Sequence, residues 1–206
     1  MSRPDYEAVR RYAFERLERE LSPALTYHSL AHTRDDVMPA VDRFAALESL
    51  SADSLLLLRT AAWLHDLGYV VQMRDHERFS AAFAAEVLPS FHYSVSDVDI
   101  VIAAIMVTRL PQTPRTLSEQ ILADADLDVL GQPDFPHKNI ALRTELATFD
   151  RTYTNTEWFA AQLQFAQDHS YFTRAAHELN DAQKARNIAW LSARLAAAHA
   201  EGNQSS

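Results

Sequence analysis

The sequence predicts an all-α protein, built as a compact bundle of about seven to nine helices. Three observations predict this class. Apolar residues recur with a period near 3.6 in one segment after another. The 206 residues contain only 3 glycines and 8 prolines, which is few for a fold that needs many turns. No segment alternates between apolar and polar residues for more than a few positions, so strands are poorly supported.

The first three helices are expected within the first third of the chain. Residues 6–20 carry a continuous apolar stripe, as a helix with one face on a core should. A second helix is expected over residues 29–47, with Pro39 kinking or breaking it, because a proline removes a backbone hydrogen bond and crowds the preceding turn. A third covers residues 55–67, and Gly68 is placed to end it.

The later helices are separated by breaks rich in proline, glycine and small polar residues. They are expected at residues 77–87, 96–107, 118–130, 139–150, 156–168 and 181–200. The loop 131–136 is the one plausible seam, and it is interpreted as internal to a single domain over residues 1–206. In this interpretation the motifs lie within residues 27–131, and residues 137–200 form a helical extension.

The composition restricts the function. With 28 acidic and 19 basic residues, the formal net charge is -9, so the chain lacks the charge of a protein that grips a nucleic-acid polymer non-specifically. The absence of cysteine excludes disulfides, thiolate zinc sites and cysteine nucleophiles. No apolar run approaches the ~20 residues of a membrane span, and the N-terminus does not have the pattern of a secretory signal. A cytoplasmic protein without a membrane partner is expected, and its oligomeric state is left open.

The dipeptide His65-Asp66 is the most informative feature. His65 follows Ala62 by three residues and Leu58 by seven, so it continues the inward stripe of its helix, and Asp66 borders that face. A buried carboxylate is costly unless something neutralises it, and a cation held by both residues would do so. A core histidine bonded to a backbone carbonyl, with Asp66 capping a neighbour, is the alternative.

Two further groups of metal-binding residue types lie on either side of this dipeptide. His28 and His32 are four residues apart and share a face if their segment is helical. Asp124, Asp126 and Asp128 lie within an apolar helix pattern, so at least one of them should face the core.

Imidazole and carboxylate ligands together suit Zn, Mn, Fe, Co or Ni better than Mg. A set of two histidines and two carboxylates leaves positions free for water, as catalytic sites do and closed structural sites do not.

The order His, then His-Asp, then Asp resembles the HD-domain superfamily of metal-dependent phosphohydrolases, in the form of its bacterial members. The resemblance covers about residues 27–131. It rests on the motifs "YHSLAHT", "AAWLHDLGYV", "DHERFSA", "IMVT" and "DADLDVLG".

The resemblance implies a role for each motif residue. His32 matches the first metal ligand, and His65 and Asp66 match the paired ligands. The last ligand is Asp126 if "ADL" is the matching triplet, or Asp124 if the register shifts by two. One helix cannot easily direct both at one ion, because positions two apart differ by about 200°. Asp126 is preferred.

The resemblance also implies catalytic residues beyond the ligands. His28 matches the position that protonates the leaving oxygen in the cyclic-nucleotide phosphodiesterase branch, and a packing role is the alternative. Glu77 is expected to orient the nucleophilic water or a ligand imidazole, unless it is an exposed residue at a helix start. Members with two metals usually add two more histidines. This chain offers only His76 and, less plausibly, His92, which disfavours a full dinuclear site.

The predicted activity is therefore a metal-dependent phosphomonoesterase or phosphodiesterase acting on a small phosphorylated substrate such as a nucleotide. The alternatives are a non-catalytic HD module that binds metal and ligand as a regulatory domain, and an iron-dependent oxygenase of the HD type.

Overall fold

A computed structural model describes residues 3–149 and 152–204. In these residues nine α-helices are joined by loops, 3₁₀ turns and one π-helical segment, and no strand occurs. The predicted fold class and number of helices are confirmed. The ends of the predicted domain 1–206, and residue 150, where one helix was predicted to end, lie outside the described residues.

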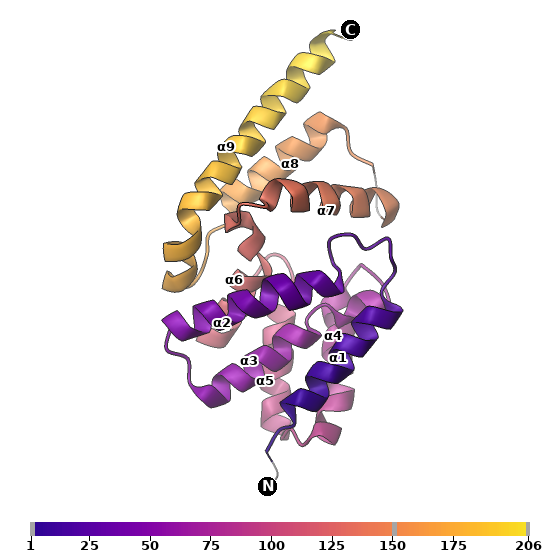
Figure 1. The fold of residues 1–206 in the computed structure, drawn as a ribbon, viewed down its shortest axis with the longest axis vertical. Helices are drawn as coiled ribbons and strands as arrows, with labels where there is room; N and C mark the ends of the chain where they lie inside the picture. Colours follow the sequence, from indigo (N-terminus) through magenta and orange to yellow (C-terminus); the bar gives the residue numbers. More distant parts are fainter. Residues whose placement is uncertain (1–2, 150–151, 205–206) are drawn as a thin grey trace.

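The first six α-helices form one body, which lies below α7 to α9 in Figure 1. They are α1 (Tyr6–Glu20), α2 (Met38–Leu47), α3 (Ala52–Leu64), α4 (His76–Val87), α5 (Val95–Val107) and α6 (Leu117–Asp126). Their apolar faces meet in a shared core, in which Phe44, Leu64, Ile105 and Leu122 are fully buried. This burial of one stripe per helix explains the 3.6 period of the sequence.

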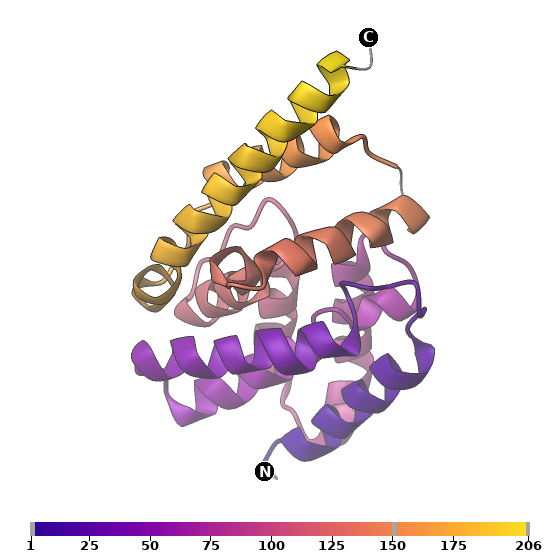
Figure 2. The ribbon, with the colours of Figure 1, turned by 45° about the horizontal axis from the view of Figure 1, so that its top comes forward.

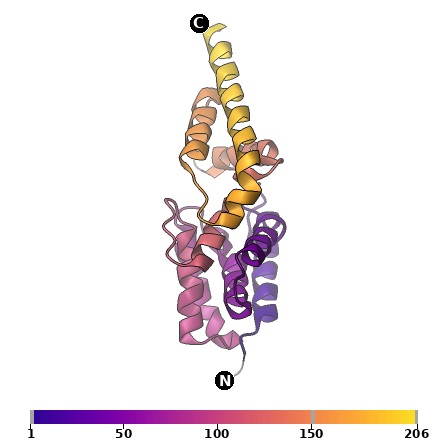
Figure 3. The ribbon, with the colours of Figure 1, turned by 90° about the vertical axis from the view of Figure 1, so that its left-hand side faces the viewer.

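The last three α-helices form a second layer. They are α7 (Phe135–Phe149), α8 (Asn155–Asp168) and α9 (Arg174–Gln204), and Figure 2 shows α7 between the body and the α8–α9 pair. This layer has its own core around Trp158 and Leu191. Ala175 and Ala176, at the start of α9, are buried in the first core, so the two layers are joined there. Figure 3 shows the chain ends at opposite ends of the molecule.

Several helices begin at side chains that satisfy free backbone N–H groups. Ser51 caps α3 by accepting a hydrogen bond from the Ser54 amide. The α5 cap is Ser94, two residues before the predicted start of the helix at residue 96, and Asp97 is its reciprocal partner in a capping box.

Of the two predicted effects of Pro39, a kink or a break, the break does not occur. A π-helical segment, His32–Val37, leads without interruption into α2, and the Met38 amide bonds to the carbonyl of Thr33, five residues earlier. In an ordinary α-helix the proline ring meets the carbonyl four residues before it. The wider π turn relieves this crowding, and such turns are frequent at functional sites.

Gly68 serves a different purpose from the predicted helix end. The helix α3 already stops at Leu64, and Gly68 lies in a 3₁₀ turn, Leu67–Val70, with an ordinary negative φ. A Cβ atom at Gly68 would lie 1.9 Å from the backbone oxygen of His76. Only glycine therefore allows the turn after Asp66 to pack against the start of α4.

Among the described residues, no helix combines the length and apolar character needed to cross a membrane. The assignment of residues 1–206 to a single domain stays a prediction.

Candidate metal centre

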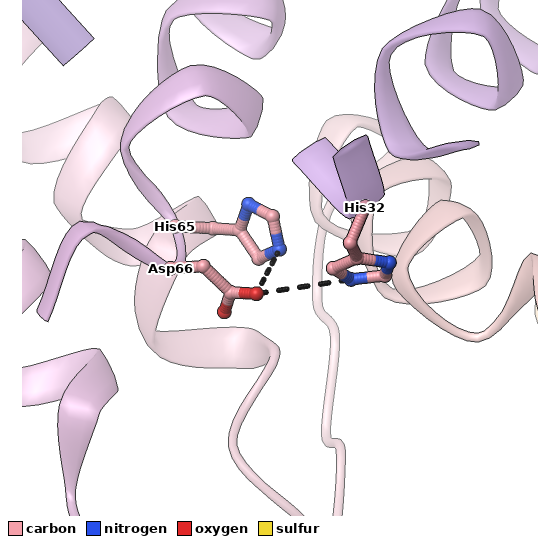
Figure 4. A group of neighbouring side chains, drawn as sticks. All are labelled: His32, His65 and Asp66. Carbon is pink, nitrogen blue, oxygen red and sulfur yellow. Dashed lines mark ion pairs between the residues drawn. The ribbon is translucent and has the colours of Figure 1, made fainter. Parts of the chain in front are cut away.

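Four of the predicted ligand residues converge from three parts of the chain. His32 begins the π-helical segment, His65 and Asp66 follow the last residue of α3, and Asp126 is the last residue of α6. Each lies at a helix end or in an irregular turn rather than in the middle of a helix. Figure 4 shows the rings of His32 and His65 turned towards the Asp66 carboxylate.

The distances define one small cluster. The Nε2 atom of His65 lies 3.3 Å from Oδ2 of Asp66 and 3.4 Å from Oδ1 of Asp126. The Nε2 atom of His32 lies 3.3 Å from the same Asp126 oxygen and 3.7 Å from Asp66 Oδ2. The ligand atoms of His32, His65 and Asp66 all lie within 4.8 Å of one another. All four side chains are largely buried.

The hydrogen bonds of the rings make this cluster suited to a cation. The Nδ1 atom of His65 lies 2.8 Å from the Ala62 carbonyl and must donate to it, so in the neutral ring Nε2 carries a lone pair. That lone pair faces two carboxylates, and His65 Nε2 and Asp66 Oδ2 are buried without a hydrogen-bond partner. Buried acceptors that face one another are costly unless positive charge lies between them. The residues therefore fit a divalent cation, and backbone-held imidazoles are typical of metal sites.

The pKa values of the cluster also indicate a site for positive charge. Burial alone would lower the pKa of His32, but the carboxylates of Asp126 and Asp36 outweigh it and raise the pKa to about 9. Burial would raise the pKa of Asp126, but His32 and His65 outweigh it and lower the pKa to about 2. The carboxylates thus draw positive charge to this point, which either protons or a metal ion can supply.

His76 extends the cluster on the side of α4. Its Nδ1 atom lies 3.1 Å from the Met73 carbonyl, and its Nε2 atom lies 3.3 Å from Oδ1 of Asp66. Glu77 is buried beside it, with Oε1 3.8 Å from His76 Nε2. The alternative of an exposed Glu77 is therefore wrong.

Asp124 does not join the cluster. It is fully buried, and its two oxygens accept hydrogen bonds from the amides of Phe172 and Thr173, at 2.8 Å each, and from the Thr173 hydroxyl at 2.7 Å. If Asp126 faces the site, Asp124 is expected on the outward side of the helix, two positions away; this expectation is wrong, because Asp124 is buried. Asp124 instead holds the segment that leads into α9.

Asp128 is likewise occupied elsewhere. It accepts hydrogen bonds from Asn180 on α9, from Arg43 on α2 and from Gln132. Of the three aspartates, only Asp126 faces the two histidines.

Glu145, on α7, is the site residue that sequence reasoning missed. Its Oε1 bonds with Nδ1 of His28, and its Oε2 accepts from the amides of Tyr27 at 2.8 Å and His28 at 3.0 Å. Burial raises the pKa of Glu145, but the bonds from His28 and the two amides outweigh it, so the carboxylate stays ionised. The His28 ring also stacks on Tyr69, with 4.4 Å between centroids.

A cavity of about 440 Å³ adjoins the cluster, a volume typical of small-molecule sites. Asp66 and Asp126 line it together with His28, His76 and Glu77. Its opposite wall comes from the segment after α6 and from α7 and α8. The body therefore provides the ionisable groups, and the second layer closes the cavity over them.

The fold and the site together define an all-helical protein with a buried His/Asp centre suited to a divalent metal. Residues 40–128 match the HD domain. His65, Asp66 and Asp126 lie inside the matched range, and His32 lies just before it.

The structure is similar to the crystal structure of a predicted HD superfamily hydrolase from an uncultured Thermotogales bacterium. The two share 23% sequence identity with a TM-score of 0.61, over 94% of this chain and 92% of the other. This similarity extends the likeness of fold beyond the HD domain to α7, α8 and α9. No curated protein matches the chain.

Proposed function

We propose that this protein is a metal-dependent phosphohydrolase, a phosphomonoesterase or phosphodiesterase, acting on a small phosphorylated substrate, with nucleotides as the first class to test. The observation that carries the proposal is the unpartnered pair of His65 Nε2 and Asp66 Oδ2, buried beside His32 and Asp126 at the wall of a cavity. The match of residues 40–128 to the HD domain and the fold shared with a predicted hydrolase support the same class.

His32, His65, Asp66 and Asp126 would hold the metal. When bound, a divalent cation supplies Lewis acidity, which acidifies water and polarises an oxygen of the phosphoryl group. The mixed His and Asp donors favour Zn, Mn, Fe, Co or Ni over Mg. His76 and Glu77 line the cavity next to Asp66, where they can accept hydrogen bonds that orient a water molecule.

His28 is proposed to protonate the leaving oxygen. Its Nδ1–H donates to Glu145, which leaves Nε2 as the atom that carries or releases a proton towards the cavity. The buried Glu145 carboxylate fixes the orientation of the His28 ring, and stacking on Tyr69 holds its plane. The proposal assigns Glu145 a positioning role, since it acts through His28.

Two cationic side chains provide charge for a phosphate. Arg109 and Lys138 line the cavity, each with a carboxylate partner: Arg109 bonds to Asp75 at 2.7 Å, and Lys138 pairs with Asp36. They offset the acidic cluster on this face. The guanidinium of Arg109 keeps further N–H groups for a phosphate oxygen.

The test is a screen of metal-reconstituted protein against aryl phosphates, nucleoside monophosphates and cyclic nucleotides. His65→Ala should abolish both metal binding and turnover, whereas His199→Ala, an exposed histidine on α9, should change neither. Metal binding without turnover of any ester would favour the non-catalytic alternative. Equal turnover by His65→Ala would refute the proposed site.

A further inference from the structure

A chain of hydrogen bonds in the second layer fixes how one amide faces the cavity. The indole Nε1 of Trp158 donates to Oδ1 of Asn139 at 2.8 Å, and Nδ2 of Asn139 donates to Oε1 of Gln162 at 2.7 Å. Since an indole can only donate, Asn139 must accept with its oxygen and donate with its nitrogen. Gln162 must then accept from Asn139 with its oxygen, which leaves its NH₂ group as a pure donor.

The residue that carries this NH₂ donor lines the cavity. Asn139 and Gln162 both line it, and no described residue accepts a hydrogen bond from Nε2 of Gln162. Asn139 and Trp158 are almost completely buried, so the chain cannot reorganise in water. Apart from Lys138, which pairs with Asp36, the cavity wall around them is apolar, and it includes Leu127, Leu130, Phe135, Leu142 and Phe165.

The two walls of the cavity therefore differ in chemistry. The body presents ionisable groups such as Asp66, Asp126 and His28. The helices α7 and α8 present mostly apolar side chains, with the amide of Gln162 as an uncharged donor and the ammonium of Lys138, which pairs with Asp36. A donor in apolar surroundings selects a ligand acceptor, because leaving it unpaired on binding would cost the desolvation of the amide.

We propose that this wall is the subsite for the alcohol part of the substrate. It takes a largely apolar, planar body that carries an uncharged hydrogen-bond acceptor, a carbonyl oxygen or a ring nitrogen, and Gln162 donates to that acceptor. The phosphoryl part lies at the acidic wall, which rests on the function proposed above. Gln162 is thus a specificity-determining residue, and Asn139 and Trp158 are its positioning residues.

A matched pair of esters tests the subsite. The 4-acetylbenzyl and 4-isopropylbenzyl phosphates have nearly the same shape and similar leaving groups, and only the first carries an acceptor at its far end. The corresponding free alcohols serve as probes for binding without catalysis, measured by ligand-observed NMR. Wild-type protein should bind the acetyl alcohol about 2- to 10-fold more tightly than its isostere, the range of one neutral hydrogen bond. KM for the two esters should differ by a similar factor, with little change in kcat.

Three variants separate the donor from the shape of the wall. Gln162→Glu keeps the acceptor for Asn139 but replaces the free NH₂ by an oxygen, so the preference for the acetyl compound should disappear or reverse. Gln162→Leu should reduce the ratio of the two binding affinities to about one. Gln167→Glu adds the same charge to the exposed side of α8 and should leave the preference unchanged.

The outcomes separate the two proposals. If the alcohols show the preference and Gln162→Glu removes it, the subsite stands even if neither ester is hydrolysed, and only the phosphohydrolase proposal fails. If both esters are hydrolysed with equal KM, the activity stands and the subsite is refuted. Binding of neither alcohol, or a preference unchanged in Gln162→Leu, also refutes it.

Discussion

Replacing Asp124 by asparagine is expected to destabilise the protein and to leave metal binding intact. The Asp124 carboxylate is fully buried and accepts three hydrogen bonds from Phe172 and Thr173, just before α9. The asparagine side chain would have the same size. However it turns, its NH₂ group meets at least one of these donors.

The magnitude follows from the bonds that are lost. A buried donor left without a partner costs about 1–3 kcal/mol, and the remaining bonds lose the strength that the ionised acceptor gave them. Asp124→Asn should therefore lower the free energy of unfolding by about 2–4 kcal/mol, which is a large part of the roughly 5–15 kcal/mol by which domains are stable. For a chain of this length, the midpoint of thermal unfolding should fall by about 5–15 °C.

The assay compares Asp124→Asn with Asp126→Asn by circular dichroism melting and by elemental analysis. Asp126→Asn should lower metal affinity at least ~10-fold, whereas Asp124→Asn should lower the melting temperature and keep the metal. The reasoning is refuted if Asp124→Asn loses its metal while its melting temperature stays at the wild-type value.

Three further predictions follow from the site. Glu145→Gln should slow turnover about 10- to 100-fold with metal content unchanged, less than the ~10²–10⁴-fold loss in His28→Ala, in steady-state assays with a poor leaving group. In protein stripped of metal, the raised pKa of His32 adds stability that is fully present below pH 6.5 and lost as pH rises through about 9. The rise in melting temperature on adding metal should therefore grow across this range, and a constant rise would contradict it. Gly68→Ala should cost about 1–3 kcal/mol or more and weaken metal binding, because its Cβ would press on the His76 carbonyl; an unchanged denaturation midpoint would contradict this.

Local patterns in the sequence predict most of the fold. Each helix buries one stripe, so the apolar period marks its position. The ends of helices were less predictable. The sequence places Gly68 as a helix end, but its real constraint is the approach of His76. At Pro39 the π-helical segment preserves a helix that an α-helical pattern would lose.

The candidate site was also predictable only in part. The motifs identify His32, His65 and Asp66, and the structure brings them together. The choice between Asp124 and Asp126 depends on partners about fifty residues away, at Phe172 and Thr173, which no local pattern reveals.

No local sequence pattern identifies Glu145 as a residue of the site. It lies 117 residues from His28, on α7, in the region expected to be an extension. Only the packing of α7 over the body makes it part of the site. The same packing creates the cavity wall that contains Gln162.

If the proposed site is right, His32, His65, Asp66 and Asp126 together bind one divalent ion. The most direct measurement is anomalous diffraction at the absorption edge of zinc or manganese, from crystals of reconstituted protein. We expect a single strong peak within bonding distance of all four side chains, about 2.0–2.2 Å from the nitrogen and oxygen ligands for zinc. A peak bonded to Asp124, or crystals with bound metal elsewhere and no peak between His65 and Asp126, would contradict it.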